Sequence, residues 1–408
     1  MKKTGLESAK ILLPKDVDMN AWAVVACDQF TGEPEYWAQV REQTLGKKTT
    51  LDLVLPEVYL NDNPDARIEK INANIKSYID GGVFTELEQG FILTIRSTPY
   101  VERRIGLIGA IDLEEYQYSK KSDALIRSTE GTVEERIPPR LKIRKDAPVE
   151  FPHVMVLFDD EKRQITEPLY QDRESYKKVY DFELNMNGGH VEGYYIPDDG
   201  QLKEKFAKLL DAQRLIDKYG KEDNFAFAVG DGNHSLATAK AHWNNVKQAL
   251  SESEKAVHPA RFALVEFVNI YDEGIYFEPI FRFVKGVDKQ AFVDGLKQVD
   301  CGNIRIFDGK NFVEQKGEAS LPEGITATDK YIAEFLEKKG GEVDYIHGES
   351  NLEKLVCQND DSVGIYFEKM DKKDLFRYVS AKGALPRKTF SMGEGIEKRY
   401  YLEGRKIR

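Results

Sequence analysis

The chain passes from a β-strand to an α-helix in residues 225–235, Phe-Ala-Phe-Ala-Val-Gly-Asp-Gly-Asn-His-Ser. The apolar run Phe225–Val229 predicts a buried strand. After the glycine turn, apolar residues recur at alternating spacings of three and four, which predicts a helix with one face against a sheet. These residues are Leu236, Ala239, Trp243, Val246 and Leu250. This succession predicts a protein of mixed strands and helices.

The backbone of the turn Gly230–Ser235 has the composition of an anion-binding site. Gly230 and Gly232 allow the main chain to approach a ligand closely. The helix that follows directs its first amides and the positive end of its dipole outward. We therefore predict that a phosphate group binds at this turn.

The side chains of the turn favour the same ligand. His234 and Ser235 can donate hydrogen bonds to phosphate oxygens, and Asn233 can donate or accept them. Asp231 can orient a hydroxyl or hold a metal ion. The alternative is an ordinary turn with a helix cap, since Asp, Gly and Asn are common in loops. The turn is neither a P-loop nor a dinucleotide fingerprint, because Ser235 stands at the third glycine position.

A basic segment supports the phosphate hypothesis. Between positions 136 and 145 five residues are basic and none is acidic: Arg136, Arg140, Lys142, Arg144 and Lys145. Arginine side chains suit phosphate, so Arg127, Arg136 and Arg140 are candidate ligands. The alternative is a solvated helix face on which these residues pair with Glu134 and Glu135.

Two further candidates follow from their positions. Trp22–Ala26 predicts a buried strand, and Asp28 just after it is a candidate catalytic carboxylate that polarises a hydroxyl. The segment Leu385–Glu394 opens a stretch to Arg408 with seven basic and three acidic residues. Lys388 in this segment is a candidate phosphate ligand, although an exposed edge strand with protective lysines is the alternative.

Other patterns predict the scaffold. Asn63, Pro64 and the spacing of the isoleucines that follow predict a helix that ends at Gly81. Residues 91–95 and 105–111 predict neighbouring strands, and residues 201–219 predict one amphipathic helix stopped by Gly220. The polar, punctuated segment 251–259 predicts a domain boundary, which divides the chain into regions 1–258 and 259–408.

Composition limits the class of protein. The chain has 408 residues and a formal charge of −11, which makes nucleic acid an unfavourable partner. Cys27, Cys301 and Cys357 form no disulfide or zinc pattern, and no apolar stretch is long enough to span a membrane. The expectation is a cytoplasmic protein with reduced thiols. His190 and Glu192 form a close histidine–carboxylate pair in a glycine-rich, turn-like stretch, and we interpret His190 as structural.

Several separated blocks, in order along most of the chain, resemble the domain-of-unknown-function family 1015 of the wider ParB and sulfiredoxin superfamily. These blocks are Ala26–Thr31 with Pro34–Trp37, Thr129–Thr132 with Glu135–Arg140, Gly230–Ser235, Val268–Asp272 and Leu385–Lys388. The resemblance implies an α+β (mixed α/β) fold, with a ParB/sulfiredoxin-like phosphate-binding core and a second mixed α/β region. It also adds Glu130 and Thr132 to the candidate phosphate-binding residues.

Superfamily relatives include a free-serine kinase, sulfiredoxin and nucleotide-hydrolysing ParB clamps, so the resemblance implies nucleotide or phosphate binding. The kinase and many family members have Asp-Gly-His-His-Arg at the turn. Here Asn233 replaces the first histidine and Ser235 replaces the arginine, which removes one cationic contact to phosphate. Phe281 likewise stands where the family pattern has histidine.

These observations lead to three hypotheses. The first is a phosphotransferase for a small metabolite, or a nucleotide hydrolase, that uses ATP or ADP and Mg²⁺ with Asp28, Asp231 and His234 as catalytic residues. The second is a ParB-like nucleotide-sensing protein. The third is a binding or regulatory protein without metabolic activity.

Overall fold

The computed structural model describes residues 2–60, 62–132 and 134–408, without the side chain of Arg136. The described chain forms two compact units. Unit 1 comprises Met1–Ile275, Val379–Gly383 and Glu394–Arg408, and unit 2 comprises Tyr276–Tyr378 and Ala384–Gly393.

The division between the units differs from the predicted boundary after His258. Strand β13 (Phe262–Asn269) follows that point and pairs with β5 and β9 inside the sheet of unit 1, so the unit extends to Ile275. The polar segment at 251–257 is a helix, α9 (Glu252–Val257). Ser251 and Glu254 form a capping box at its start, which explains why polar residues begin a helix here.

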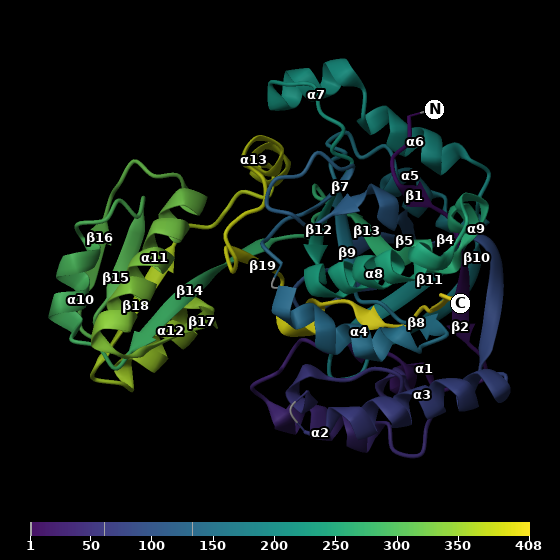
Figure 1. The fold of residues 1–408 in the computed structure, drawn as a ribbon, viewed down its shortest axis with the longest axis horizontal. Helices are drawn as coiled ribbons and strands as arrows, with labels where there is room; N and C mark the ends of the chain where they lie inside the picture. The colour runs from purple at the N-terminus through teal and green to yellow at the C-terminus, as the bar shows by residue number, and fades with distance from the viewer. Residues whose placement is uncertain (1, 61, 133) are drawn as a thin grey trace. The chain divides into compact units, whose positions relative to one another are not determined.

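A mixed sheet organises unit 1 and has 11 strands within the described residues (Figure 1). Its path runs β10-β11-β4-β5-β13-β9-β12-β7-β6, with β1 paired to β5 and β2 to β4. The strands are β1 (Leu6–Glu7), β2 (Ala9–Pro14), β4 (Phe84–Ser97), β5 (Arg104–Asp112), β6 (Tyr116–Gln117), β7 (Ile126–Ser128), β9 (Met155–Phe158), β10 (Lys177–Glu183), β11 (His190–Pro197), β12 (Phe227–Asp231) and β13.

Parallel and antiparallel pairs meet around β12. This strand runs parallel to β7 and antiparallel to β9. The residues that follow β7 and β12 therefore lie at the same end of these strands as the residues that precede β9. The glycine turn lies at this end of the strands.

The sheet of unit 1 is buried on both faces. Along β4, Phe91 and Leu93 contribute to one core and Ile92 to the other, as the alternation of strand side chains requires. The helices of this unit are α1 (Met19–Trp22), α2 (Pro34–Gln43), α3 (Pro64–Asp80), α4 (Ile137–Lys145), α5 (Thr166–Gln171), α6 (Gln201–Leu209), α7 (Ala212–Tyr219), α8 (Asn233–Val246) and α9. Helices α5 to α8 contribute to the first core, and α1, α2 and α3 contribute to the second.

Two short pairings bring the end of the chain into unit 1. Strand β20 (Tyr400–Tyr401) pairs with β3 (Val24–Val25), and β21 (Arg405–Lys406) pairs with β8 (Val149–Glu150). The C-terminal residues thus belong to the same unit as the N-terminal residues.

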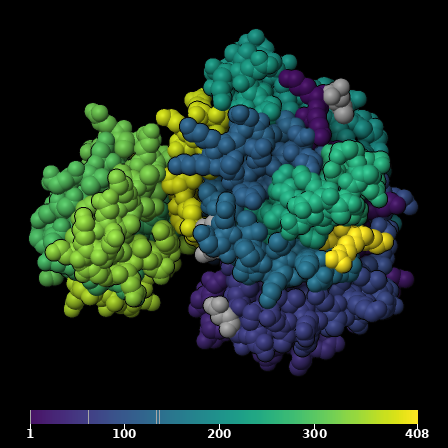
Figure 2. Space-filling view, in the orientation of Figure 1, coloured from purple at the N-terminus to yellow at the C-terminus, as the bar shows by residue number. Residues whose placement is uncertain are grey.

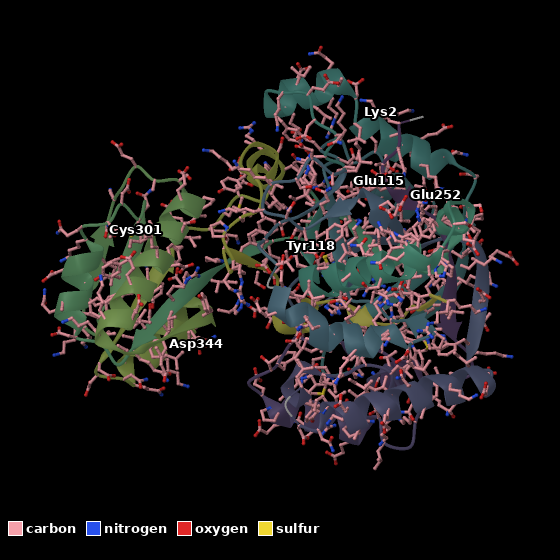
Figure 3. All side chains as sticks on the ribbon, in the orientation of Figure 1. Lys2, Glu115, Tyr118, Glu252, Cys301 and Asp344 are labelled. Atoms are coloured by element: carbon pink, nitrogen blue, oxygen red, sulfur yellow. The ribbon has the colours of Figure 1, made fainter. Side chains whose placement is uncertain are left out.

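Unit 2 is a smaller sheet of six strands, counted over the described chain, with helices on both faces. Its elements are β14 (Phe277–Lys285), α10 (Lys289–Leu296), β15 (Ile304–Phe307), β16 (Phe312–Gln315), α11 (Leu321–Lys339), β17 (Glu342–His347), α12 (Glu349–Cys357), β18 (Ser362–Phe367) and β19 (Phe390–Met392). Helix α13 (Asp374–Lys382) contains the point where the chain returns to unit 1. Cys301, labelled in Figure 3, is buried in this unit.

The structure corrects two predicted elements. Residues 22–26 are not one strand, because Asp18 caps the short helix α1 with its carboxylate and leaves only Val24–Val25 to pair as β3. Residues 201–219 form two helices instead of one, because Asp211 accepts a hydrogen bond from the Arg214 amide and starts α7. Ile216 of α7 is 41% exposed.

The other predicted elements are present, although the strand predicted at Phe225–Val229 is β12 at Phe227–Asp231, and α8 ends at Val246, before the predicted helix position Leu250. Helix α3 begins at Pro64 and ends before Gly81, β4 pairs with β5, and α8 buries Leu236, Ala239 and Trp243. In the helices of the described chain, none is long and apolar enough to cross a membrane.

Candidate functional site

The glycine turn joins β12 to α8 through a backbone that requires glycine. Asp231 is the last residue of β12, and Gly232 has a φ of +76°. A Cβ atom on Gly232 would lie 3.0 Å from the Cα of Val154. The left-handed φ and the close neighbour both favour a residue without a side chain. Gly232 offers no side-chain cap, so the first amides of α8 are not capped from that position.

The segment after β7 is fastened to the turn. Thr129 Oγ1 donates a hydrogen bond of 2.6 Å to the Val229 carbonyl oxygen. The Ser128 hydroxyl lies 2.6 Å from Asn233 Oδ1 and 2.6 Å from the Glu130 carbonyl oxygen. The two predicted motifs, residues 128–132 and 230–235, therefore lie together at the C-terminal ends of the neighbouring strands β7 and β12. Asn233 is buried and uses its side-chain oxygen within the fold.

Asp28 and Asp231 both lie near His153, two residues before the start of β9. Asp28 Oδ2 lies 3.6 Å from His153 Nε2. Burial alone would lower the pKa of His153, but the charges of Asp28 and Asp231 outweigh it and hold this pKa above its ordinary value. The protonated form of His153 is therefore favoured by the neighbouring Asp28 carboxylate.

The charge of Lys398 acts on both carboxylates. Its ammonium is 3.5 Å from Asp231 Oδ2, and its charge helps to lower the pKa of Asp28. Burial would raise the pKa of Asp28, but His153 and Lys398 together hold it well below its usual range. We name these four residues the Asp28 cluster: Asp28, His153, Asp231 and Lys398.

The Asp28 cluster has an outer and an inner layer. The carboxylate side chains of Asp28 and Asp231 are 30% and 18% exposed, whereas those of His153 and Lys398 are only 8% and 9% exposed. A ligand from solvent can thus reach the carboxylates, whereas His153 and Lys398 are almost inaccessible to solvent.

Strand pairing near the chain end positions the cluster. The Ala26 amide donates to the Arg399 carbonyl oxygen at 2.9 Å, next to the β3–β20 pair. The Tyr401 hydroxyl accepts from the Cys27 amide at 3.1 Å and lies 2.8 Å from His153 Nδ1. Residues separated by 374 positions are joined in this way. Burial raises the pKa of the Cys27 thiol to about 12, so this thiol is neutral and no nucleophile.

The predicted ligands Arg127 and Arg140 already have carboxylate partners within the protein. Arg127 is buried, and its guanidinium forms a 2.5 Å ion pair with Asp223 and contacts the Phe225 ring. Arg140 forms an ion pair with Glu57. The side chain of Arg136 lies outside the described residues.

The other predicted residues occupy three different environments. His234 and Ser235 are half-buried in the first turn of α8, and Glu130 is half-buried beside it. Thr132 Oγ1 is buried and makes no hydrogen bond with any residue that the structure describes. Lys388 is exposed in unit 2, where its carbonyl oxygen accepts from Arg282.

Sequence reasoning missed His153, Lys398 and Tyr401. His153 lies two residues before the start of β9, so its position close to a strand end is the signal that could have found it. Lys398 was counted among the basic residues of the tail, but nothing local distinguishes it from its neighbours. Phe281, at the position of a family histidine, is buried in unit 2 against Tyr366.

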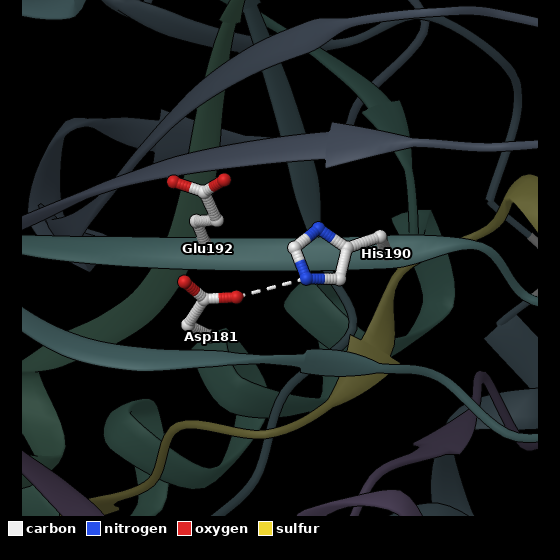
Figure 4. Close-up of side chains that lie close together, drawn as sticks. All are labelled: Asp181, His190 and Glu192. Atoms are coloured by element: carbon white, nitrogen blue, oxygen red, sulfur yellow. Dashed lines mark hydrogen bonds and ion pairs between the residues drawn. The ribbon is translucent and has the colours of Figure 1, made fainter.

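A second polar group lies on the hairpin of β10 and β11 (Figure 4). His190 Nε2 lies 2.9 Å from Asp181 Oδ1, and Glu192 is the cross-strand partner of Asp181. The Lys178 ammonium already lies 2.7 Å from Asp181 and 3.5 Å from Glu192, so a cation of the chain neutralises both carboxylates. This agrees with a structural role for His190.

The family described as "Protein of unknown function (DUF1015)" matches residues 10–377, and the chain belongs to this family. No curated protein matches the chain.

Solved structures give low similarity. A conserved hypothetical protein from Pyrococcus furiosus has 10% identity and a TM-score of 0.37, covering 72% of this chain and 93% of its own. A free serine kinase in complex with AMP has 10% identity and a TM-score of 0.40, covering 74% and 92%. A C-terminally truncated SbnI from Staphylococcus aureus has 10% identity and a TM-score of 0.37, covering 70% and 82%.

Proposed function

We propose that this protein binds a nucleotide, ATP or ADP, at the Gly230–Ser235 turn and transfers or hydrolyses its terminal phosphate, with a small metabolite as the acceptor. The observation that carries the proposal is the Asp28 cluster, in which two accessible carboxylates and a buried ammonium stand beside the N-terminus of α8. The ParB/sulfiredoxin-like character of the core is part of the same proposal.

The residues of the turn suit a phosphate group. The first amides of α8 and the positive end of its dipole attract an anion, and α8 is 14 residues long. Lys398 adds a full positive charge behind Asp231. His234 and Ser235 donate to phosphate oxygens from the same helical turn, and Thr132 offers a hydroxyl beside it.

The carboxylates suit the acceptor and the metal. Asp28 is ionised at neutral pH because its pKa is lowered, so it accepts a hydrogen bond from an acceptor hydroxyl and orients it. In a loose phosphoryl transition state, such positioning contributes more than strong basicity. Asp231 fits a Mg²⁺ ion, since this metal takes one or two protein carboxylates together with phosphate oxygens. Bound Mg²⁺ would neutralise phosphate charge.

Binding and turnover are tested in sequence on the full chain. We expect ATP or ADP with Mg²⁺ to raise the melting temperature, and phosphorus NMR to show conversion of ATP when an acceptor is present. His234→Ala should weaken both effects, whereas His347→Ala, an exposed histidine of unit 2, should leave them unchanged. Equal binding and turnover in His234→Ala would refute the assignment.

The same measurements separate enzyme from sensor. A nucleotide that stabilises the protein but is recovered unchanged with every acceptor would support the nucleotide-sensing or regulatory hypothesis. Lys388 and the segment Leu385–Glu394 remain a proposed contribution to the site, and Lys388→Gln tests them in the same binding assay.

A further inference from the structure

A cavity of about 240 Å³ lies between α2, α3 and two short 3₁₀ helices, η1 (Thr50–Asp52) and η2 (Glu57–Tyr59). All of its lining residues belong to unit 1, and none belongs to the Asp28 cluster. In Figure 2 the purple N-terminal segment that contains these helices forms a continuous surface layer of unit 1. The volume is below the roughly 300–1,000 Å³ of sites for drug-sized ligands, so the cavity suits a smaller molecule.

The inner wall of the cavity is apolar. Trp37, Leu51 and Ile71 are buried side chains that line it. The indole N–H of Trp37 donates to the Gln29 carbonyl oxygen at 3.1 Å, so this donor already has a partner within the protein. Such a wall accepts a flat or aliphatic molecular body.

The rim of the cavity is positively charged. Three cations, Arg41, Arg67 and Lys70, line the cavity with a single carboxylate, Asp52. Arg41 pairs with Asp52 at 2.7 Å, and Arg67 pairs with Asp62 and lies 4.5 Å from the centre of the Tyr59 ring. The exposed side chain of Lys70 has no ion pair or hydrogen bond with the described residues. Because Asp52 and Asp62 compensate the two arginines, Lys70 supplies the remaining positive charge of the rim, and this charge favours an anionic group.

The cavity walls also hold the loop that carries Asp28. Trp37 binds the carbonyl oxygen of Gln29, the residue after Asp28. The Glu57 amide, next to the cavity residue Pro56, donates to the Cys27 carbonyl oxygen at 2.8 Å. The backbone on both sides of Asp28 is thus hydrogen-bonded to elements that a ligand in the cavity would contact.

We propose that this cavity binds a small organic anion with an apolar body, of the class of aromatic carboxylates, and that its occupancy stiffens the Asp28 loop. The anionic group lies at Lys70 and the apolar body against Trp37. This inference does not depend on nucleotide binding, because its ligand, its residues and its readouts are separate.

Three probes of similar shape and different charge test the site on the full chain: benzoate, benzyl alcohol and benzylamine. Saturation-transfer NMR measures the binding of each probe. We expect benzoate to bind most tightly and benzylamine not to bind. Lys70→Glu should weaken benzoate binding about tenfold or more, the change that a difference of about 1.4 kcal/mol produces. Because Lys70 is exposed, this variant should fold.

Lys76→Glu is the matched control, since it makes the same charge change on the same helix at a residue that does not line the cavity. Benzoate should bind this variant as it binds the native protein. Equal affinity of Lys70→Glu and Lys76→Glu, or no preference for benzoate over benzylamine, would overturn the assignment of the site.

Hydrogen exchange tests the coupling to Asp28. Saturating benzoate should slow amide exchange in peptides covering residues 26–31 and 56–59, and Lys70→Glu should abolish this slowing at the same benzoate concentration. Benzoate that binds without changing exchange in these peptides would disprove the coupling.

Discussion

Gly232 is the residue on which the geometry of the turn depends. Its φ of +76° costs an L-residue with a side chain about 1–2 kcal/mol, and its approach to the backbone of Val154 adds a steric cost. Gly200 has a comparable φ of +83° but nothing within 4 Å of an added Cβ atom. The two glycines thus separate the cost of conformation from the cost of crowding.

We predict that Gly232→Ala lowers the free energy of unfolding by more than Gly200→Ala does. Gly200→Ala should cost about 1–2 kcal/mol from its φ alone, and Gly232→Ala should exceed this and also displace the amides of the turn. Urea denaturation of both variants measures the difference. Equal costs would show that Val154 relaxes and that crowding has no influence.

The ion pair of His153 and Asp28 makes stability depend on pH. The raised pKa of His153 contributes stability that is complete below its unfolded value of about 6.5 and is lost as pH rises through the folded pKa. The lowered pKa of Asp28 contributes stability that is present above about 3.9 and is lost as pH falls. Both contributions are therefore present together between about pH 4 and 6.5.

We predict that Asp28→Asn has a lower free energy of unfolding than the native protein, and that this difference is largest between about pH 5 and 6. The difference should shrink as pH rises past the folded pKa of His153, because the imidazolium charge is then lost. Urea midpoints of both proteins from acidic to alkaline pH provide the measurement. A difference that stays constant over this range would contradict the proposed charge state.

At the scale of elements, short polar residues decide where helices start. Periodicity alone predicts one helix over residues 201–219, since apolar positions continue in phase through Leu209 and Ile216. Asp211 interrupts it, because its carboxylate accepts from the Arg214 amide at 3.0 Å and caps a new helix. Helix α3 shows the opposite case, in which Pro64 and Gly81 mark both ends correctly.

We predict that Asp211→Ala destabilises unit 1 by about 1 kcal/mol, the usual cost of losing an N-cap side chain. Asp217→Ala, an exposed aspartate within the same helix α7, should have a much smaller effect. Thermal and urea denaturation compare the two variants. If both variants lose the same stability, the cap is not what separates α6 from α7.

At the scale of the molecule, the C-terminal residues complete unit 1. Arg405 of β21 is buried and forms a 3.0 Å ion pair with Glu150 of β8. It also donates to the Pro259 carbonyl oxygen at 2.9 Å. The neighbouring Lys406 is 56% exposed and pairs with Glu86 at the surface. The same strand therefore offers a buried and an exposed ion pair for comparison.

We predict that Arg405→Ala costs about 3 kcal/mol or more, because Glu150 is left buried with one cationic partner fewer. Lys406→Ala should cost at most about 1 kcal/mol, as is usual for a surface pair. Urea denaturation again compares the variants, with circular dichroism as a check of the fold. If Arg405→Ala and Lys406→Ala lowered the free energy of unfolding by the same amount, the buried ion pair of Arg405 would contribute no more to stability than the surface pair of Lys406.

The sequence by itself determined the elements whose cause is local. The strand and helix on either side of Gly232, helix α3 and the β4–β5 pair follow from spacing, caps and turn residues, which depend only on neighbours in the chain. It also placed Asp28 and Asp231 among the candidate carboxylates.

Only the tertiary structure decided that Asp28 and Asp231 share His153 and Lys398, and that Arg127 is held by Asp223. These contacts depend on the pairing of β3 with β20 and on the order of β9, β12 and β7 in the sheet. Such pairings join residues hundreds of positions apart. Local periodicity carries no information about them, because it reports which face of an element is buried and not which element covers that face.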